Sequence, residues 1–175
     1  MWAAILALER GDAEDLRAHL RALEEQALDD APAQIRLPAE AFAGHMEVLD
    51  GRFAAGLERV RRVREALVHG VAPAPGLPGV VTRTLLEGYA LAGEARAGLA
   101  LADEALVMGR GGELWEAESR RLRATFLAEL GAPASAVEEE LRRALAVARR
   151  QGARAFELRV RGTLAERGLG HDADG

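Results

Sequence analysis

The segment GHMEVLDGRFAAG, residues 44–56, contains the pattern that decides the fold. An apolar stretch with helical spacing ends at the corner Asp50-Gly51-Arg52, and a second such stretch begins at Phe53. Glycine adopts the left-handed backbone conformation that commonly ends a helix, so this corner predicts a turn between two helices. Gly44 and Gly56 lie on either side of the turn, where small residues let paired helices cross closely.

The same corner recurs along the chain. Five glycines, spaced by 40, 42, 38 and 37 residues, each close an apolar stretch: Gly11, Gly51, Gly93, Gly131 and Gly168. A helix–turn–helix unit repeated every ~40 residues is typical of an α-solenoid. The sequence therefore predicts an all-α fold, an α-α superhelix of tetratricopeptide type with about nine antiparallel helices. The period is closer to the HEAT and armadillo lengths, and an irregular helical bundle is a further alternative.

We expect one repeat domain over residues 1–168, with units at about 1–31, 32–70, 80–109, 113–151 and 153–168, and a flexible tail at 169–175. Asp12 is the expected N-cap of the second helix, because a short acceptor side chain there can bind a free backbone N–H. The proline-rich stretch 71–79 is predicted to be a stiff connection, since proline fixes φ. Gly109, Gly111 and Gly112 are expected to break the chain between the third and fourth units.

Composition excludes several kinds of chemistry. All 23 basic residues are Arg, so the chain has no lysine for a Schiff base or a phosphate-binding P-loop. The net charge of −5 disfavours a nucleic-acid-binding domain, which needs a basic face. The absence of cysteine is compatible with the cytoplasm, where we expect the protein. No apolar run is long enough for a membrane span, so no membrane partner is expected.

The sequence contains no constellation typical of an enzyme. Its four histidines, His19, His45, His69 and His171, lack the spacing of a metal-binding helix, so no metal site is predicted. His171 and the acidic residues after it lack most ligands of a calcium loop, which favours a disordered tail. Ser119 and Ser135 do not lie in a nucleophile elbow. We expect a non-catalytic protein without a cofactor.

The first helix of each pair lines the concave surface of such a solenoid. With the glycine corners as the frame, the side chains expected there are His45, Arg83, Glu87, Arg121, Thr125, Glu129 and Arg159. The three arginines recur 38 residues apart, and guanidinium groups recognise carboxylates through paired hydrogen bonds. The alternative is that these arginines pair with neighbours such as Glu87.

The strongest basic cluster is RVRRVR, residues 59–64. Val60 and Val63 continue the apolar stripe of Leu57 and Leu67, so the arginines are expected on the outer face of this helix. No aromatic residue lies among them to stack on bases. A solvated surface is therefore favoured over contact with nucleic acid.

The second half of the chain carries a closer likeness. Residues 97–106 read AGLALADEAL, 114–118 read LWEAE and 121–123 read RLR; after Gly131, residues 141–153 read LRRALAVARRQGA and 157–159 read ELR. This pattern resembles the C-terminal tetratricopeptide region of large bacterial signalling ATPases. Those are multidomain regulators, often joined to a LuxR-type or SARP-type DNA-binding domain or to an adenylate cyclase domain. The ATPase motifs of that family are absent here, and the first half matches only in its repeat rhythm.

The resemblance implies an interaction or sensor module of a bacterial regulator, which binds a peptide, protein or small effector and passes the signal to neighbouring domains. Two alternatives stay open. The apolar helix at 2–10 could pair with a second copy to form a homodimer, and the 59–64 face could contact nucleic acid. The abrupt start at Met1-Trp2 predicts a fragment of a longer protein, with a short stand-alone protein as the alternative.

Overall fold

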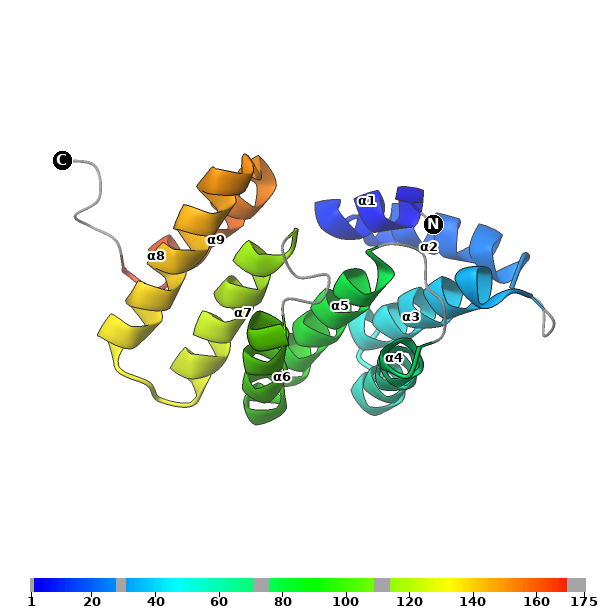
Figure 1. Cartoon of the computed structure of the whole chain (residues 1–175), viewed down its shortest axis with the longest axis horizontal. Helices are drawn as coiled ribbons and strands as arrows, with labels where there is room; N and C mark the ends of the chain where they lie inside the picture. The colour runs from blue at the N-terminus through cyan, green and yellow to red at the C-terminus, as the bar shows by residue number, and fades with distance from the viewer. Residues whose placement is uncertain (1, 28–30, 71–75, 109–113, 170–175) are drawn as a thin grey trace. The chain divides into compact units, whose positions relative to one another are not determined.

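The computed structural model describes residues 2–27, 31–70, 76–108 and 114–169. Within these ranges the chain forms nine helices and no strand, which confirms the predicted all-α class (Figure 1). None of the described helices is long and apolar enough to cross a membrane. The chain divides into two compact units, Met1–Ala92 and Gly93–Gly175. That residues 1–168 form a single repeat domain stays a prediction.

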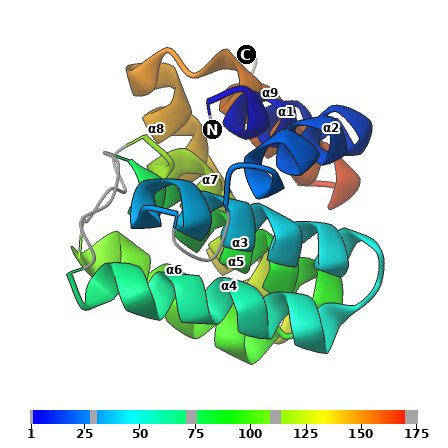
Figure 2. The same ribbon diagram turned by 90° about the vertical axis from the view of Figure 1, so that its right-hand side faces the viewer.

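The first unit contains five helices: α1 (Trp2–Arg10), α2 (Ala13–Glu24), α3 (Ala33–Leu49), α4 (Phe53–Val68) and α5 (Leu77–Ala92). Each packs against the next in sequence, and α5 also packs against α3. Helices α3 and α4 form a long hairpin whose arms lie side by side (Figure 2). The apolar side chains of these helices face one another and form the core of the first unit. Its almost completely buried side chains include Leu16, Phe42, Leu57, Val81 and Leu86.

The second unit contains α6 (Ala95–Met108), α7 (Glu116–Glu129), α8 (Ala134–Gln151) and α9 (Arg154–Glu166). Consecutive helices again pack together, and α9 also contacts α7. One core cluster of this unit joins α7, α8 and α9 through Ala124, Val137, Leu141, Ala144, Val160 and Leu164. Most of these side chains are small or aliphatic, as the low aromatic content of the sequence requires.

All five predicted corner glycines have a positive φ, between 65° and 81°. At Gly51 the backbone N–H donates to the Val48 carbonyl at 2.9 Å, and the Arg52 N–H donates to the Glu47 carbonyl at 2.8 Å. This pair of bonds is a Schellman motif, which satisfies the free carbonyls at the end of α3. The same two bonds end α8 at Gly152, with φ of 64°, a corner that the ~40-residue spacing does not include.

The predicted close crossing of the α3–α4 hairpin is also confirmed. A Cβ atom added to Gly56 would lie 2.5 Å from the Gly44 carbonyl oxygen. A Cβ atom added to Gly44 would lie 2.8 Å from a methyl carbon of Val60. Both positions therefore require the smallest residue, because real Cβ atoms do not approach neighbours so closely.

Helix boundaries differ from the expectation at two places. Helix α5 begins at Leu77, so the end of the predicted 71–79 connection is wrong. Pro78 fits the first turn of α5 because the backbone N–H groups there have no partner within a helix. Helix α7 begins at Glu116, three residues after the start expected for the fourth unit.

Some predictions fall outside the described residues. They concern 71–75, the glycines at 109, 111 and 112, and the tail from 170 with His171. The predicted third unit, 80–109, is divided between the two compact units.

Candidate functional site

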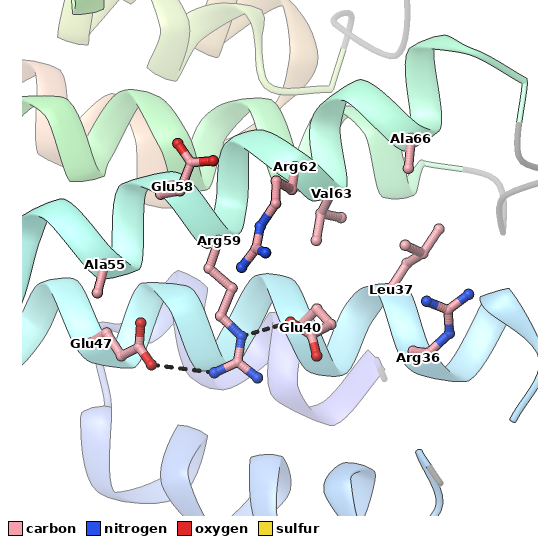
Figure 3. A pocket seen from close by; sticks show the side chains of 10 residues that line it. All are labelled: Arg36, Leu37, Glu40, Glu47, Ala55, Glu58, Arg59, Arg62, Val63 and Ala66. Atoms are coloured by element: carbon pink, nitrogen blue, oxygen red, sulfur yellow. Dashed lines mark hydrogen bonds and ion pairs between the residues drawn. The ribbon is translucent and has the colours of Figure 1, made fainter. Parts of the chain in front are cut away.

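A groove of about 680 Å³ runs along the α3–α4 hairpin of the first unit (Figure 3). Its lining positions recur three, four or seven residues apart on each helix, a spacing that gathers side chains on one helical face. Helix α3 contributes Arg36, Leu37, Glu40 and Glu47, and helix α4 contributes Ala55, Glu58, Arg59, Arg62, Val63 and Ala66. The groove therefore has charged walls above a partly apolar floor.

Arg59 bridges the two helices at the middle of this groove (Figure 3). Its Nε donates a hydrogen bond to Glu40 Oε2 at 2.6 Å, and its Nη1 donates to Glu47 Oε1 at 3.2 Å. The hydrogen bond from Arg59 holds the pKa of Glu40 below its usual value, although partial burial acts in the opposite direction. The same bond raises the pKa of Arg59. Arg59 is thus held in place by two carboxylates.

The other two arginines of the groove are placed differently. In the part of the chain that the structure describes, neither Arg36 nor Arg62 makes a hydrogen bond or an ion pair. Both are exposed, and the charge of each adds to the lowering of the pKa of Glu40. Glu58, by contrast, pairs with Arg61 at 3.1 Å. Each carboxylate of the groove has a guanidinium partner, whereas within the described residues these two guanidinium groups have no direct carboxylate partner.

The predicted apolar stripe of the basic cluster 59–64 is confirmed, because Leu57, Val60, Val63 and Leu67 are all buried. The expectation that the arginines spread over the outer face is wrong for Arg59, which lies along the hairpin. Arg61 also points back to the protein, where its Nε donates to the Tyr89 hydroxyl at 3.0 Å and its guanidinium stands over the ring.

The structure brings together three of the residues predicted for a concave surface. His45 of α3 and Arg83 of α5 are only 3% and 2% exposed, so they lie inside the first unit and the expected surface placement is corrected. Arg83 Nη1 lies 3.3 Å from Glu87 Oε2, and Arg83 Nε lies 3.3 Å from Glu9 Oε1 of α1. This ion pair with Glu87 is the alternative that the sequence left open.

This interior cluster is incompletely hydrogen-bonded. His45 Nδ1, Arg83 Nε, Arg83 Nη1 and Glu87 Oε2 are buried atoms for which the geometry gives no hydrogen bond. Burial lowers the pKa of His45; the Glu87 carboxylate raises it and the Arg83 guanidinium lowers it further. The cluster therefore holds a neutral imidazole next to a buried cation, an arrangement that is sensitive to protonation.

Predicted residues of the second unit gather around a buried carboxylate, Glu118, which is 1% exposed. Arg121 donates to it twice, through Nε at 2.9 Å and Nη2 at 2.7 Å. Arg159 Nη1 lies 3.6 Å from the same carboxylate. The Thr125 hydroxyl donates to the Arg121 carbonyl at 3.3 Å, while Glu129 is exposed at the end of α7. Ligand binding by these residues stays a prediction, as does the 38-residue ladder, whose members belong to different units.

Sequence reasoning did not identify the two buried carboxylates of this unit, Glu118 and Glu140. Glu140 is 3% exposed and accepts a hydrogen bond from Arg120 at 3.1 Å. Arg123 and Arg143 lie within 3.4 and 3.7 Å of it. The available signal was weak: Arg143 follows Glu140 by three residues on α8, a spacing that is common on solvated faces, whereas Arg120 and Arg123 come from α7. A buried carboxylate such as Glu140 differs from a solvated one only in its burial, which the sequence does not show.

No group of three or more histidine, aspartate or glutamate side chains in the described ranges could hold a metal ion. Ser119 is buried, and the clusters above are ion pairs between carboxylates and guanidinium groups. Comparison of the chain with family models, curated proteins and solved structures finds no match. The function must therefore be argued from these residues.

Proposed function

We propose that this protein is a non-catalytic interaction module whose α3–α4 groove receives a segment of a peptide or protein partner. The observation that supports this proposal is the groove itself. Its volume of about 680 Å³ lies within the range of ligand sites, roughly 300–1,000 Å³. Four of its lining side chains, at positions 36, 55, 58 and 62, are exposed, so it is open along its length. An open groove between helices suits an extended or helical segment better than an enclosed small molecule.

The repeated architecture supports the same proposal. Helical hairpins that end at glycine corners with regular spacing are the building units of α-solenoids, which bind partners along their surfaces. In this proposal the chain is a tetratricopeptide-like module of a cytoplasmic bacterial regulator, and binding is passed on to neighbouring domains. The resemblance of the second half to the repeats of signalling ATPases adds to this proposal.

Self-association is the second candidate, because Leu6 on α1 is 60% exposed. The exposed apolar surface of α1 is smaller than the sequence implied, because Ala4, Ile5, Ala7 and Leu8 of this helix are buried. Light scattering over a range of concentrations tests this candidate. A mass that rises with concentration for the wild type, and not for Leu6→Asp, would support it, and a constant monomer mass would reject it.

The main proposal is tested by selecting binders to the whole chain from a library of random peptides. Two variants fill the groove from its ends, Ala55→Trp and Ala66→Trp, and the matched control is Ala54→Trp, an exposed neighbour outside the lining. Selected peptides should lose about tenfold or more in affinity for at least one groove variant and bind the control normally. A failure to select any peptide, or equal binding to all three variants, would reject the groove as the binding site.

A further inference from the structure

We propose that the occupant of the α3–α4 groove is an acidic peptide, whose carboxylate is held between Arg36 and Arg62 while an apolar neighbour lies on Leu37 and Val63. This inference rests on the proposed function and names the chemistry of its partner. Three features of the groove support it: the pairing of its charges, their position and the adjacent apolar surface.

The charges of the groove are balanced in number but not in pairing. Three arginines and three glutamates line it. Arg59 is shared by Glu40 and Glu47, and Glu58 is paired with Arg61, which lies outside the lining. Arg36 and Arg62 are left without a direct partner among the described residues. An incoming anion therefore meets two guanidinium groups that have no carboxylate partner among the described residues, whereas an incoming cation meets carboxylates that already pair with a guanidinium.

The two arginines project from opposite walls of the groove. Arg36 belongs to α3 and Arg62 to α4, and the guanidinium of Arg62 points from its helix toward α3 (Figure 3). Both act on the charge of Glu40, which lies between them along the groove. Exposed arginine side chains can rotate to grip a carboxylate from two sides through bidentate hydrogen bonds.

Apolar surface lies at the same end of the groove. Leu37, Val63 and Ala66 accompany Arg36 there, whereas Glu47 and Ala55 lie toward the other end (Figure 3). Leu37 and Val63 line the groove and are 5% and 3% exposed, so they contribute a small, fixed apolar floor. A ligand that places an apolar side chain next to its carboxylate would cover this floor and the arginines together.

A carboxylate and a phosphate are both anions that guanidinium groups bind. A peptide carboxylate has one negative charge, whereas a phosphorylated side chain carries about −1.5 to −2 at neutral pH. The attraction of the two arginines and the repulsion from Glu40 both increase with the charge of the ligand, so the phosphorylated peptide is the comparison that tests the choice of a carboxylate. The proposed ligand group is the carboxylate of an aspartate, a glutamate or a peptide carboxyl terminus.

The experiment uses the whole chain and three labelled peptides of equal length. The first repeats Leu-Glu, the second repeats Leu-Gln, and the third repeats Leu-phosphoserine. Fluorescence anisotropy at low salt should give the Leu-Glu peptide about tenfold or more tighter binding than the Leu-Gln peptide. In the double variant Arg36→Gln/Arg62→Gln, the ratio of the Leu-Glu to the Leu-Gln affinity should fall close to one. The control Arg52→Gln changes one exposed arginine at the hairpin corner, outside the groove, and should leave the ratio of the two affinities unchanged.

Each outcome has a defined meaning. Equal binding of the Leu-Glu and Leu-Gln peptides, with both abolished by Ala55→Trp or Ala66→Trp, would overturn the carboxylate inference and leave the proposed function intact. A preference that survives in the double variant, or tighter binding of the phosphorylated peptide, would also overturn it. Binding of none of the three peptides would overturn the inference, and the selection from random peptides would then decide the proposed function separately. Because Arg36 and Arg62 are exposed, circular dichroism should show the double variant fully folded.

Discussion

The ring of Phe126 in α7 lies directly against the backbone of Gly98 in α6. A Cβ atom at position 98 would stand 2.3 Å from Phe126 Cζ and 2.5 Å from Cε1. Phe126 is fully buried, so its ring has little space in which to retreat. The absence of a side chain at Gly98 therefore sets how closely α6 and α7 pack.

This contact predicts that Gly98→Ala is destabilising, although alanine is the better helix former by about 1 kcal/mol. Overpacking a closed core costs about 1–3 kcal/mol, which should lower the free energy of unfolding measured with urea. Gly162→Ala is the matched control, because nothing lies within 4 Å of a Cβ at this helical position in α9. It should raise stability by about 0.5–1 kcal/mol. Equal effects at the two glycines would disprove the close contact.

Arg83 provides the second prediction. Its guanidinium is 2% exposed between Glu9 and Glu87, so Arg83→Met should leave two carboxylates facing each other across an apolar side chain. Breaking a fully buried pair costs about 3–5 kcal/mol, but the glutamates are 20% and 31% exposed, which reduces the expected loss to about 2 kcal/mol. Arg10→Ala removes an exposed pair with Asp15 and should cost less than about 1 kcal/mol. A more stable Arg83→Met protein would contradict a stabilising role for the pair.

His45 makes stability depend on pH. Burial lowers its pKa in the folded protein below the ordinary value of 6.5, so the unfolded chain takes up the proton first as the pH falls. The contribution is fully present above pH 6.5 and is lost as the pH falls from there through the folded pKa. One proton gives a slope of at most about 1.4 kcal/mol per pH unit.

Urea unfolding between about pH 5 and 7 measures this slope, because Glu40 and Asp50, whose pKa values are also lowered, lose their contributions below 4.5 and 3.8. His45→Asn should flatten the slope. His69→Asn changes an exposed histidine and should leave the slope in place. The same steep slope in His45→Asn would show that another group titrates.

Glu139 and Glu140 form a matched pair of neighbours on α8. The Glu140 side chain is 4% exposed among three arginines, whereas that of Glu139 is 63% exposed and pairs with Arg143. Glu140→Gln should cost about 2 kcal/mol, because charged hydrogen bonds in a buried site are lost and the arginines keep their charge. Glu139→Gln should change stability by less than about 0.5 kcal/mol. Thermal unfolding of both variants measures the difference, and similar midpoints would contradict the burial of Glu140.

Local rules were enough to predict most helices. The stretch 2–10 is a helix with the expected bounds, α4 begins at Phe53 as expected, and Asp12 caps α2 by accepting the Asp15 N–H at 3.0 Å. These features depend on residues within one or two helical turns, and such information is contiguous in the sequence. The boundary of α5 was wrong because Pro78 fits both a connection and a first helical turn.

The sequence predicted the candidate site residues less well than the helices. The sequence placed His45, Arg83 and Glu87 along a concave surface with four other residues, whereas the structure places His45 and Arg83 in the interior of the first unit and leaves Glu87 half-buried beside Arg83. The groove residues Arg36 and Glu40 were not singled out at all. Nothing in the local pattern distinguishes an arginine that binds a neighbouring carboxylate from one that has none.

The sequence by itself therefore determined the helical class, the glycine corners and the close crossing at Gly44 and Gly56, because backbone conformation and helical periodicity are local properties. Only the tertiary structure decided which charges are buried, which carboxylates pair with an arginine, and which arginines of the groove have no carboxylate partner among the described residues. The physical reason is that burial and pairing depend on side chains brought together from different helices, such as Glu9 of α1 and Arg83 of α5.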